Sequence, residues 1–193
     1  QAAALREQFG VEPDDLVVLF AAKLIPVKGC ADLIRAFAAR PREKTTLVIA
    51  GEGPLRRELV DLAARFPDRS VRFVGFMNQS QMPAVYALGD VFVIPSNQEP
   101  WGLAVNEAMN LACPIIASDQ VGCAPDLVSS ENGWIFPAEN VQALDAVLTE
   151  ALADRDILDK KGQASLARIE NWDIRHTADG FFEGTRAVTS SRL

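Results

Sequence analysis

Short apolar runs alternate with longer amphipathic segments along most of the chain. Six of these runs predict strands, and they cover residues 16–22, 45–50, 71–74, 91–94, 115–118 and 134–136. The first run is apolar without a period of two, which is typical of a strand that is buried on both faces. Strands separated by helices predict an α/β fold, because parallel neighbours need crossover connections. We therefore expect a Rossmann-like, doubly wound parallel sheet of six strands with helices on both faces.

Helices are predicted between these strands and at both ends of the chain. Gly10 closes an opening helix as a C-cap, and Pro54 and Pro114 mark a helix start and a helix end. The predicted helices cover residues 2–9, 29–40, 54–66, 79–88, about 102–112 and 125–129. From residue 140 onward the pattern is helical, with breaks expected near Asp154 and Asn171.

Composition limits the domain count and the class of partner. The chain has 193 residues, 49% of them hydrophobic, so it can bury a full core, and we take residues 1–193 as a single domain. The formal net charge of −7 argues against a nucleic-acid or anionic-membrane surface and favours a small-molecule partner. No apolar run reaches the roughly 18 to 20 residues that a membrane-spanning helix needs.

The cysteines bear on location and on metal chemistry. Cys30, Cys113 and Cys123 are an odd number without CxxC spacing, so they indicate neither a disulfide framework nor a zinc site. A reduced, cytoplasmic location fits this usage. The sequence does not start with Met, and we expect it to be part of a longer protein.

The candidate site lies where the predicted strands end. Ligands of doubly wound sheets bind at the carboxyl ends of the strands. Lys23 and Lys28 follow the first strand, the Gly51 turn follows the second, and Glu99 lies in the loop after the fourth. Glu107 lies about one turn inside the next helix, so free N–H groups at the helix start fall between two carboxylates. This layout suits an anionic group flanked by hydroxyls, as in a sugar nucleotide.

Several motifs carry a family resemblance. Glu99 and Glu107 are separated by seven intervening residues in a segment that starts E-P-W-G-L, which is similar to an E-x7-E signature. Residues 23–29 (K-L-I-P-V-K-G) look like G-R-L-x-x-x-K-G, and G-E-G-P at 51–54 and N-G at 132–133 add support. In this order, the motifs resemble the C-terminal half of a retaining glycosyltransferase of family four (group 1), an enzyme class with the two-domain GT-B fold. One half of a GT-B fold is therefore expected.

The resemblance implies roles for the charged residues. Lys23 and Lys28 would hold the diphosphate of a nucleoside diphosphate sugar, and Glu99 would accept hydrogen bonds from hexose hydroxyls. These three side chains are the candidate catalytic residues, because ammonium groups oppose the charge on a departing diphosphate. Glu107 would bind the ribose hydroxyls.

The resemblance also assigns backbone contacts to the donor. Gly102 and Leu103 would contribute N–H groups, and the loop at Phe76 and Met77 would pass beside the nucleobase. The donor sugar is then a substrate, and neither a cofactor nor a metal is expected. The partners would be a nucleotide sugar and the N-terminal, acceptor-binding domain of the same enzyme.

Some residues depart from the family pattern. Ala22-Lys23 replaces the usual Gly-Arg, which keeps the charge but loses the bidentate fork that suits phosphate. Trp101 replaces a more usual Phe, and Gly122-Cys123 with Asp126 stand where the family often has paired glycines followed by Glu. The hexose, the nucleobase and the acceptor are not readable from these positions.

Structural interpretations compete for several of these residues. A Glu in the first turns of a helix is favourable without a ligand, and Lys23 and Lys28 taken singly would be surface lysines. The D-x-D at 154–156 lies between helical segments, so a capping role is favoured over metal binding. His176 is the only histidine and lies far from the strand ends, which excludes Ser-His-Asp chemistry.

The sequence as a whole predicts the donor-binding half of a retaining enzyme that transfers a hexose to a glycan, a lipid-linked or another acceptor. Without its N-terminal domain we expect binding but no turnover. A terminal helix at about 171–193 should pack on that domain and present Phe181, Phe182 and Val188. One alternative is a non-catalytic nucleotide or nucleotide-sugar binding module. A Rossmann dehydrogenase is disfavoured, because no G-x-G-x-x-G follows the first strand.

Overall fold

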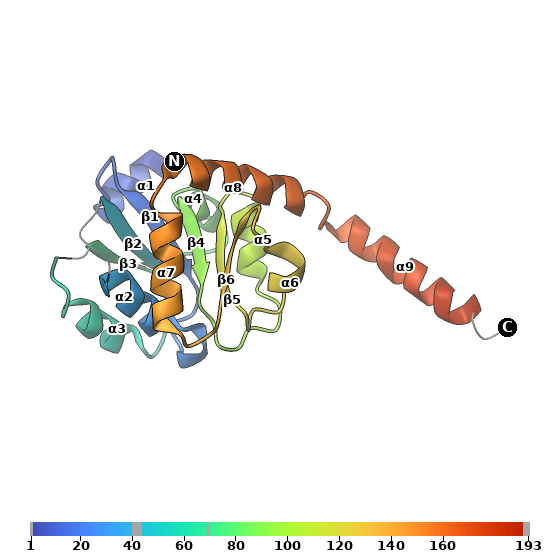
Figure 1. Ribbon diagram of the computed structural model, residues 1–193, viewed down its shortest axis with the longest axis horizontal. Coiled ribbons are helices and arrows are strands. Elements are labelled where there is room, and N and C mark those ends of the chain that lie inside the picture. The colour runs from blue at the N-terminus through green and yellow to red at the C-terminus, as the bar shows by residue number, and fades with distance from the viewer. Residues whose placement is uncertain (1, 40–43, 69, 191–193) are drawn as a thin grey trace.

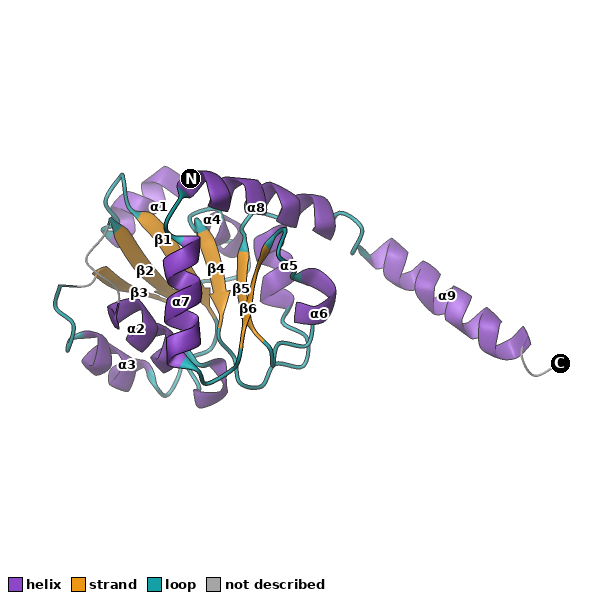
Figure 2. Ribbon diagram, viewed as in Figure 1, coloured by secondary structure: helices purple, strands orange, loops and turns teal. Residues whose placement is uncertain are grey.

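The computed structural model describes residues 2–39, 44–68 and 70–190, and its centre is a parallel sheet (Figures 1 and 2). The sheet order is β3-β2-β1-β4-β5-β6, which confirms the predicted doubly wound α/β fold. The strands are β1 Leu16–Ala21, β2 Thr45–Ala50, β3 Ser70–Gly75, β4 Val91–Ile94, β5 Ile115–Ser118 and β6 Gly133–Phe136. The direction of winding reverses between β1 and β4, and such a switch point is where sheets of this kind bind ligands.

Helices cover both faces of this sheet (Figure 2). They are α1 Ala2–Phe9, α2 Cys30–Ala39, α3 Arg56–Ala63, α4 Met82–Tyr86, α5 Leu103–Met109, α6 Ala124–Leu127, α7 Val141–Ala151, α8 Arg155–Ile169 and α9 Ile174–Ser190, with a 3-10 turn at Pro26–Lys28. On one face α2 contacts α3 and α7, and on the other α4 contacts α1 and α5. Arg40 and Leu193, which were predicted helix ends, lie outside the described residues.

The core has two parts because the strands are buried on both faces. In β1, Val17 and Leu19 belong to one hydrophobic cluster, and Val18 and Phe20 belong to the other. Alternate side chains of a strand point to opposite faces, so a strand between two helical layers needs apolar residues throughout. This explains why the first apolar run shows no period of two.

Two predicted helix starts were placed too early. α3 begins at Arg56, because the N–H of Leu55 donates to the carbonyl of Leu24 (3.1 Å) and ties Pro54 into the preceding turn. α4 begins at Met82 instead of residue 79. Residues 78–81 form a separate turn, in which Asn78 Oδ1 accepts from the N–H of Gln81 (3.1 Å).

The end of α5 also differs from the prediction. α5 ends at Met109, and Ala112 adopts a positive φ of 56°, which ends the helical path before Pro114.

The C-terminal part of the chain follows the predicted breaks. Asp154 Oδ1 accepts from the N–H of Asp156 (2.9 Å), which confirms the capping role of the D-x-D segment at the start of α8. α9 extends away from the sheet and its helices (Figure 1). Trp172, between α8 and α9, packs against Trp101 with ring centroids 5.9 Å apart. Among the helices of the described residues, none has the length and apolar character needed to cross a membrane.

Candidate functional site

The loops after β1 and β4 meet at the switch point of the sheet. The N–H of Asn97 donates to the carbonyl of Val27 (2.9 Å) and joins the two loops. Gly29 has a φ of 66°, and a Cβ there would lie 2.0 Å from the carbonyl oxygen of Pro95. Only glycine therefore allows this approach. The close contact brings two of the predicted site residues together.

Those two residues are Lys28 and Glu99. Lys28 Nζ forms an ion pair with Glu99 Oε2, and both side chains are part-buried, with 21% and 15% of their surface exposed. Lys23 lies nearby in the chain but is exposed, and within the described part of the chain it forms no ion pair. Of the two lysines predicted to bind phosphate, Lys28 is thus ion-paired and part-buried, whereas Lys23 is exposed to solvent.

The backbone of the Glu99 loop is fixed by the segment after β5. The carbonyls of Glu99 and Trp101 accept from the N–H groups of Gly122 and Cys123, both at 2.9 Å. A Cβ at Gly122 would lie 2.0 Å from the carbonyl oxygen of Pro100, so the two segments are in direct backbone contact. The position of Glu99 is therefore set by β5 as well as by β4.

The start of α5 offers N–H groups to a ligand. Gly102 is the N-cap with a φ of 99°, and it makes no side-chain capping bond. Among the described residues, the N–H groups of Gly102 and Leu103 have no hydrogen-bond acceptor. The side chain of Leu103 is exposed. N–H groups without an acceptor at a helix start can bind an anion, and their binding of phosphate oxygens remains a prediction from the sequence.

Glu107, one turn along α5, is held by a residue that the sequence analysis did not identify. Glu107 Oε2 accepts a hydrogen bond from the hydroxyl of Tyr86 on α4 (2.7 Å). Tyr86 is 2% exposed, and its ring packs edge-on against Phe92 with centroids 5.6 Å apart. Burial, together with the bond to Glu107, raises the pKa of Tyr86 above its ordinary value, so the hydroxyl remains a donor at all physiological pH values.

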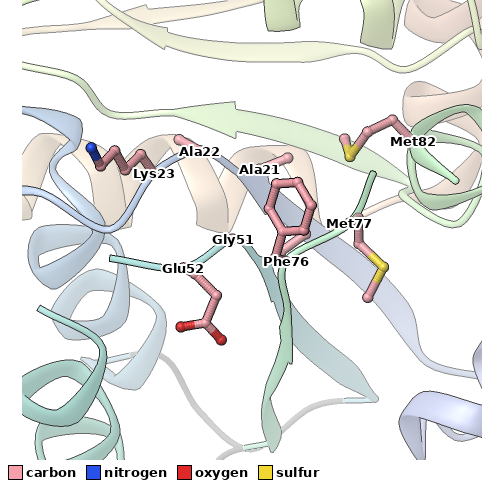
Figure 3. Close-up of a pocket in the computed structure, with 9 residues that line it drawn as sticks. Ala21, Ala22, Lys23, Gly51, Glu52, Phe76, Met77 and Met82 are labelled. Atoms are coloured by element: carbon pink, nitrogen blue, oxygen red, sulfur yellow. The ribbon is translucent and has the colours of Figure 1, made fainter. Parts of the chain in front are cut away.

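A pocket of about 400 Å³ opens beyond the carboxyl ends of β1, β2 and β3 (Figure 3). Its lining is mostly apolar and consists of Ala21, Ala22, Lys23, Ala50, Gly51, Glu52, Phe76, Met77 and Met82. Figure 3 shows the Phe76 ring near Gly51, with Met77 and Met82 on one side and Lys23 on the other. Gly51 has a φ of 142°, and a Cβ there would lie 1.9 Å from the carbonyl oxygen of Ala22.

The structure therefore divides the predicted site residues into two groups. Lys23, Phe76 and Met77 line the pocket, whereas Lys28 and Glu99 form the ion pair. Glu107 is joined to α4, which also contributes Met82 to the pocket.

Sequence reasoning missed Tyr86 and Met82. The one available signal was that Tyr86 is the only tyrosine in the chain. Glu52, which the sequence places only in the turn after the second strand, lies in the pocket wall and forms an ion pair with Arg56 (3.0 Å).

Other chemistries find little support at this site. Burial raises the pKa of the Cys123 thiol to about 11, so no reactive thiolate forms beside the Glu99 loop. His176 lies exposed on α9, where its ring bonds Asp173 (2.8 Å). In the described ranges, no three His, Cys, Asp or Glu residues gather as metal ligands would.

Comparison with known proteins places these features in a family. Residues 1–167 match the family model of the group 1 glycosyl transferases. The chain belongs to the group 1 glycosyltransferases. An uncharacterized glycosyltransferase of Methanocaldococcus jannaschii is 32% identical over 174 residues, which are 87% of this chain and 44% of that protein. The chain thus spans less than half the length of this curated relative.

Solved structures of glycosyltransferases share the fold. Sucrose-phosphate synthase from Thermosynechococcus elongatus is 27% identical with a TM-score of 0.81, over 98% of this chain and 49% of that one. Anabaena HepE, solved in complex with UDP-glucose, is 26% identical with a TM-score of 0.80, over 100% of this chain and 52% of that one. The resemblance read from the motifs is confirmed at the level of the family and its Rossmann-like fold.

Proposed function

We propose that this chain is the donor-binding half of a retaining glycosyltransferase that uses a nucleoside diphosphate hexose. The observation that carries the proposal is that four features of a nucleotide-sugar site lie along the carboxyl edge of the sheet. It holds an apolar pocket, a carboxylate on α5, free N–H groups and a Lys–Glu pair. These features match a nucleoside, its ribose, a diphosphate and a hexose. Anabaena HepE, with a similar fold, was solved with UDP-glucose bound.

The apolar pocket suits the nucleoside. A base would lie against Phe76 and Met77, and Glu107 would accept hydrogen bonds from ribose hydroxyls. Phe76 is 73% exposed, so its ring face is available to a ligand at the pocket mouth. Lys23, in the same lining, would begin the contact with the diphosphate.

The remaining groups suit the diphosphate and the hexose. Lys28 and the N–H groups of Gly102 and Leu103 would hold the phosphates, and Glu99 would accept hydrogen bonds from hexose hydroxyls. As the bond to the hexose breaks, Lys23, Lys28 and the N–H groups would oppose the charge on the leaving diphosphate. With these cations in place, the proposal needs no metal ion.

Transfer would need a second domain. In the proposed enzyme, the N-terminal domain supplies the acceptor site for a glycan, a lipid-linked or another acceptor. This chain alone would then bind the donor without turnover.

Thermal unfolding with a panel of ligands tests the proposal. UDP-, GDP- and ADP-hexoses are each compared with NAD at equal concentration. A ligand at about a hundred times its dissociation constant adds roughly 2.7 kcal/mol to the free energy of unfolding. At least one nucleotide sugar should raise the melting temperature, and NAD should not. Stabilisation by NAD alone would contradict the proposal. Replacement of Glu131, an exposed carboxylate outside the site, by Ala should leave every shift unchanged.

A further inference from the structure

We propose that Tyr86 is a positioning residue that holds the Glu107 carboxylate in place for the hydroxyls of a ribose. This inference rests on the proposed function and adds a residue that lies outside the motifs quoted above. It also makes a claim about specificity, because only a ligand with ribose hydroxyls would gain from the arrangement.

The first argument is the contrast in mobility between the two side chains. Glu107 is exposed on α5, and an exposed Glu otherwise samples several rotamers. Tyr86 is 2% exposed, and the thiol of Cys113 bonds its carbonyl oxygen (3.2 Å) while its ring packs against Phe92. The rigid residue therefore fixes the mobile one through the 2.7 Å hydrogen bond.

The second argument is that one oxygen of the Glu107 carboxylate can still accept a hydrogen bond from a ligand. Tyr86 donates to Oε2, and among the described residues Oε1 of Glu107 has no hydrogen-bond partner. One oxygen is thus used for orientation while the other stays available as an acceptor. A hydrogen bond formed by a group that is already oriented costs less side-chain entropy.

The third argument is the position of this carboxylate relative to the pocket. Tyr86 and Met82 stand four residues apart on α4, so they lie on the same face of that helix. Met82 lines the pocket. The hydrogen bond therefore joins Glu107 to the helix that contributes Met82 to the pocket wall. A tyrosine that served only to pack α4 against the sheet would need no hydroxyl.

Calorimetry on the whole chain separates positioning from packing. The probes are UDP, GDP and ADP, each measured beside its 2′,3′-dideoxy analogue. Wild-type protein should prefer the ribose form of at least one of them by roughly tenfold or more, the factor expected for a hydrogen bond to a charged group. Tyr86→Phe keeps the ring and should reduce this preference at least about threefold. Its affinity for the dideoxy form should stay within about twofold of wild type.

Controls make the effect specific. Trp134→Phe removes a comparable donor, since Trp134 Nε1 bonds Glu150 (2.8 Å) away from the site, and should leave the preference unchanged. In a Glu107→Ala background, Tyr86→Phe should change the UDP affinity by less than about twofold, because the group it positions is gone. Glu107→Gln leaves the Tyr86 ring in place and replaces a charged acceptor by a neutral amide, so it should also reduce the preference.

Two outcomes would overturn the inference in different ways. In one outcome, Tyr86→Phe loses equal affinity for the ribose and dideoxy forms, or loses none for either. Tyr86 would then be only a packing residue, and the proposed function would still stand. Failure of wild-type protein to bind any of the three nucleoside diphosphates would overturn both the inference and the proposed function.

Discussion

The candidate site has two halves, the Lys28–Glu99 ion pair and the apolar pocket, and they differ in whether a contact must break before a ligand can bind. In the ion-pair half, Lys28 and Glu99 neutralise each other. In the pocket half, a cavity of about 400 Å³ lined by Phe76 and Met77 is already open, and Glu107, joined to α4, accepts a hydrogen bond from a neutral hydroxyl. A nucleoside could enter the pocket half without breaking a contact. Under the proposed function, a nucleoside diphosphate hexose would replace this ion pair, because its phosphate would bind the Lys28 ammonium group and its sugar hydroxyls would bind the Glu99 carboxylate.

This difference has an energetic consequence. A part-buried charge that loses its partner is penalised, so a ligand that takes only Lys28 leaves Glu99 uncompensated. In the proposed complex, the complete nucleotide sugar would provide partners for both Lys28 and Glu99, whereas a free nucleoside diphosphate would provide one for Lys28 alone. Under the proposed function, the ion-pair half should therefore bind the intact donor more tightly than the product diphosphate, and the pocket half should bind the two equally well.

The largest expected losses of stability come from adding a side chain at the two glycines that allow close backbone contacts, one in each half of the site. Gly29→Ala would clash with Pro95 and force the two loops of the ion-pair half apart, and Gly51→Ala would clash with Ala22 under the pocket. Each change combines overpacking with a positive φ and should lower the free energy of unfolding by about 2 to 4 kcal/mol. Urea denaturation measures this.

Gly184→Ala is the matched control for both glycine changes. A Cβ at Gly184 meets nothing within 4 Å and Ala is the better helix former, so the free energy of unfolding should not fall and should rise by no more than about 1 kcal/mol. A similarly small change for Gly29→Ala would mean that the two loops do not approach as closely as described.

The fold could be predicted because its signals are local. The runs at β2, β4 and β5 are apolar enough to be buried, and their bounds matched the predicted residues. The errors fell at helix ends. At residues 78–81, side chains of Asn78 and Gln81 bond the backbone and compete with the helix, and sequence periodicity does not register this competition.

The site could be predicted only in part, because its contacts are long-range. The E-x7-E motif marked Glu99 and Glu107 without revealing their partners, which lie 71 and 21 residues away along the chain. The bond from Tyr86 depends on the packing of α4 against α5, and no spacing rule encodes it. The side chain of Val188, predicted as an apolar contact of the terminal helix, lies outside the described residues.

The second largest effect should follow from Glu107→Ala, which breaks the pocket half. If Glu107 binds ribose, the change should weaken both a nucleoside diphosphate and its hexose conjugate by about 1 to 3 kcal/mol, the cost of losing a hydrogen bond to a charged group. Calorimetry with UDP and UDP-glucose measures both. Glu131→Ala serves as the control. A loss confined to the hexose conjugate would place the sugar, not the ribose, at Glu107.

A smaller and opposite pattern should follow from Glu99→Ala, which breaks the ion-pair half. The change frees Lys28, so the affinity for a nucleoside diphosphate should stay unchanged or rise by up to about 1 kcal/mol, the scale of a part-exposed ion pair. The additional affinity that the hexose provides should disappear. The same two titrations decide this, and equal losses for both ligands would show that Glu99 does not discriminate between them.

The smallest effect should come from α9, which belongs to neither half. α9 extends away from the sheet, and Phe181 and Phe182 are 69% and 61% exposed, as predicted for an apolar surface without its full partner (Figure 1). Deletion of residues 174–193 keeps the contact of Trp172 with Trp101, so the free energy of unfolding should change by less than about 0.5 kcal/mol. Both ligand affinities should also stay the same.

Amide hydrogen exchange tests the same helix without a deletion. Few packed contacts mean low local stability, so residues 174–188 should exchange much faster than the central strands. The full-length chain with Gly184→Ala, a better helix former, should slow exchange within α9 and leave β1 and β4 unaffected. Protection of α9 equal to that of the central strands, in a monomer, would contradict the expectation that this helix packs on a second domain. Detectable sugar transfer by this chain alone would contradict it more strongly, because catalysis would then need no group beyond those of the two halves.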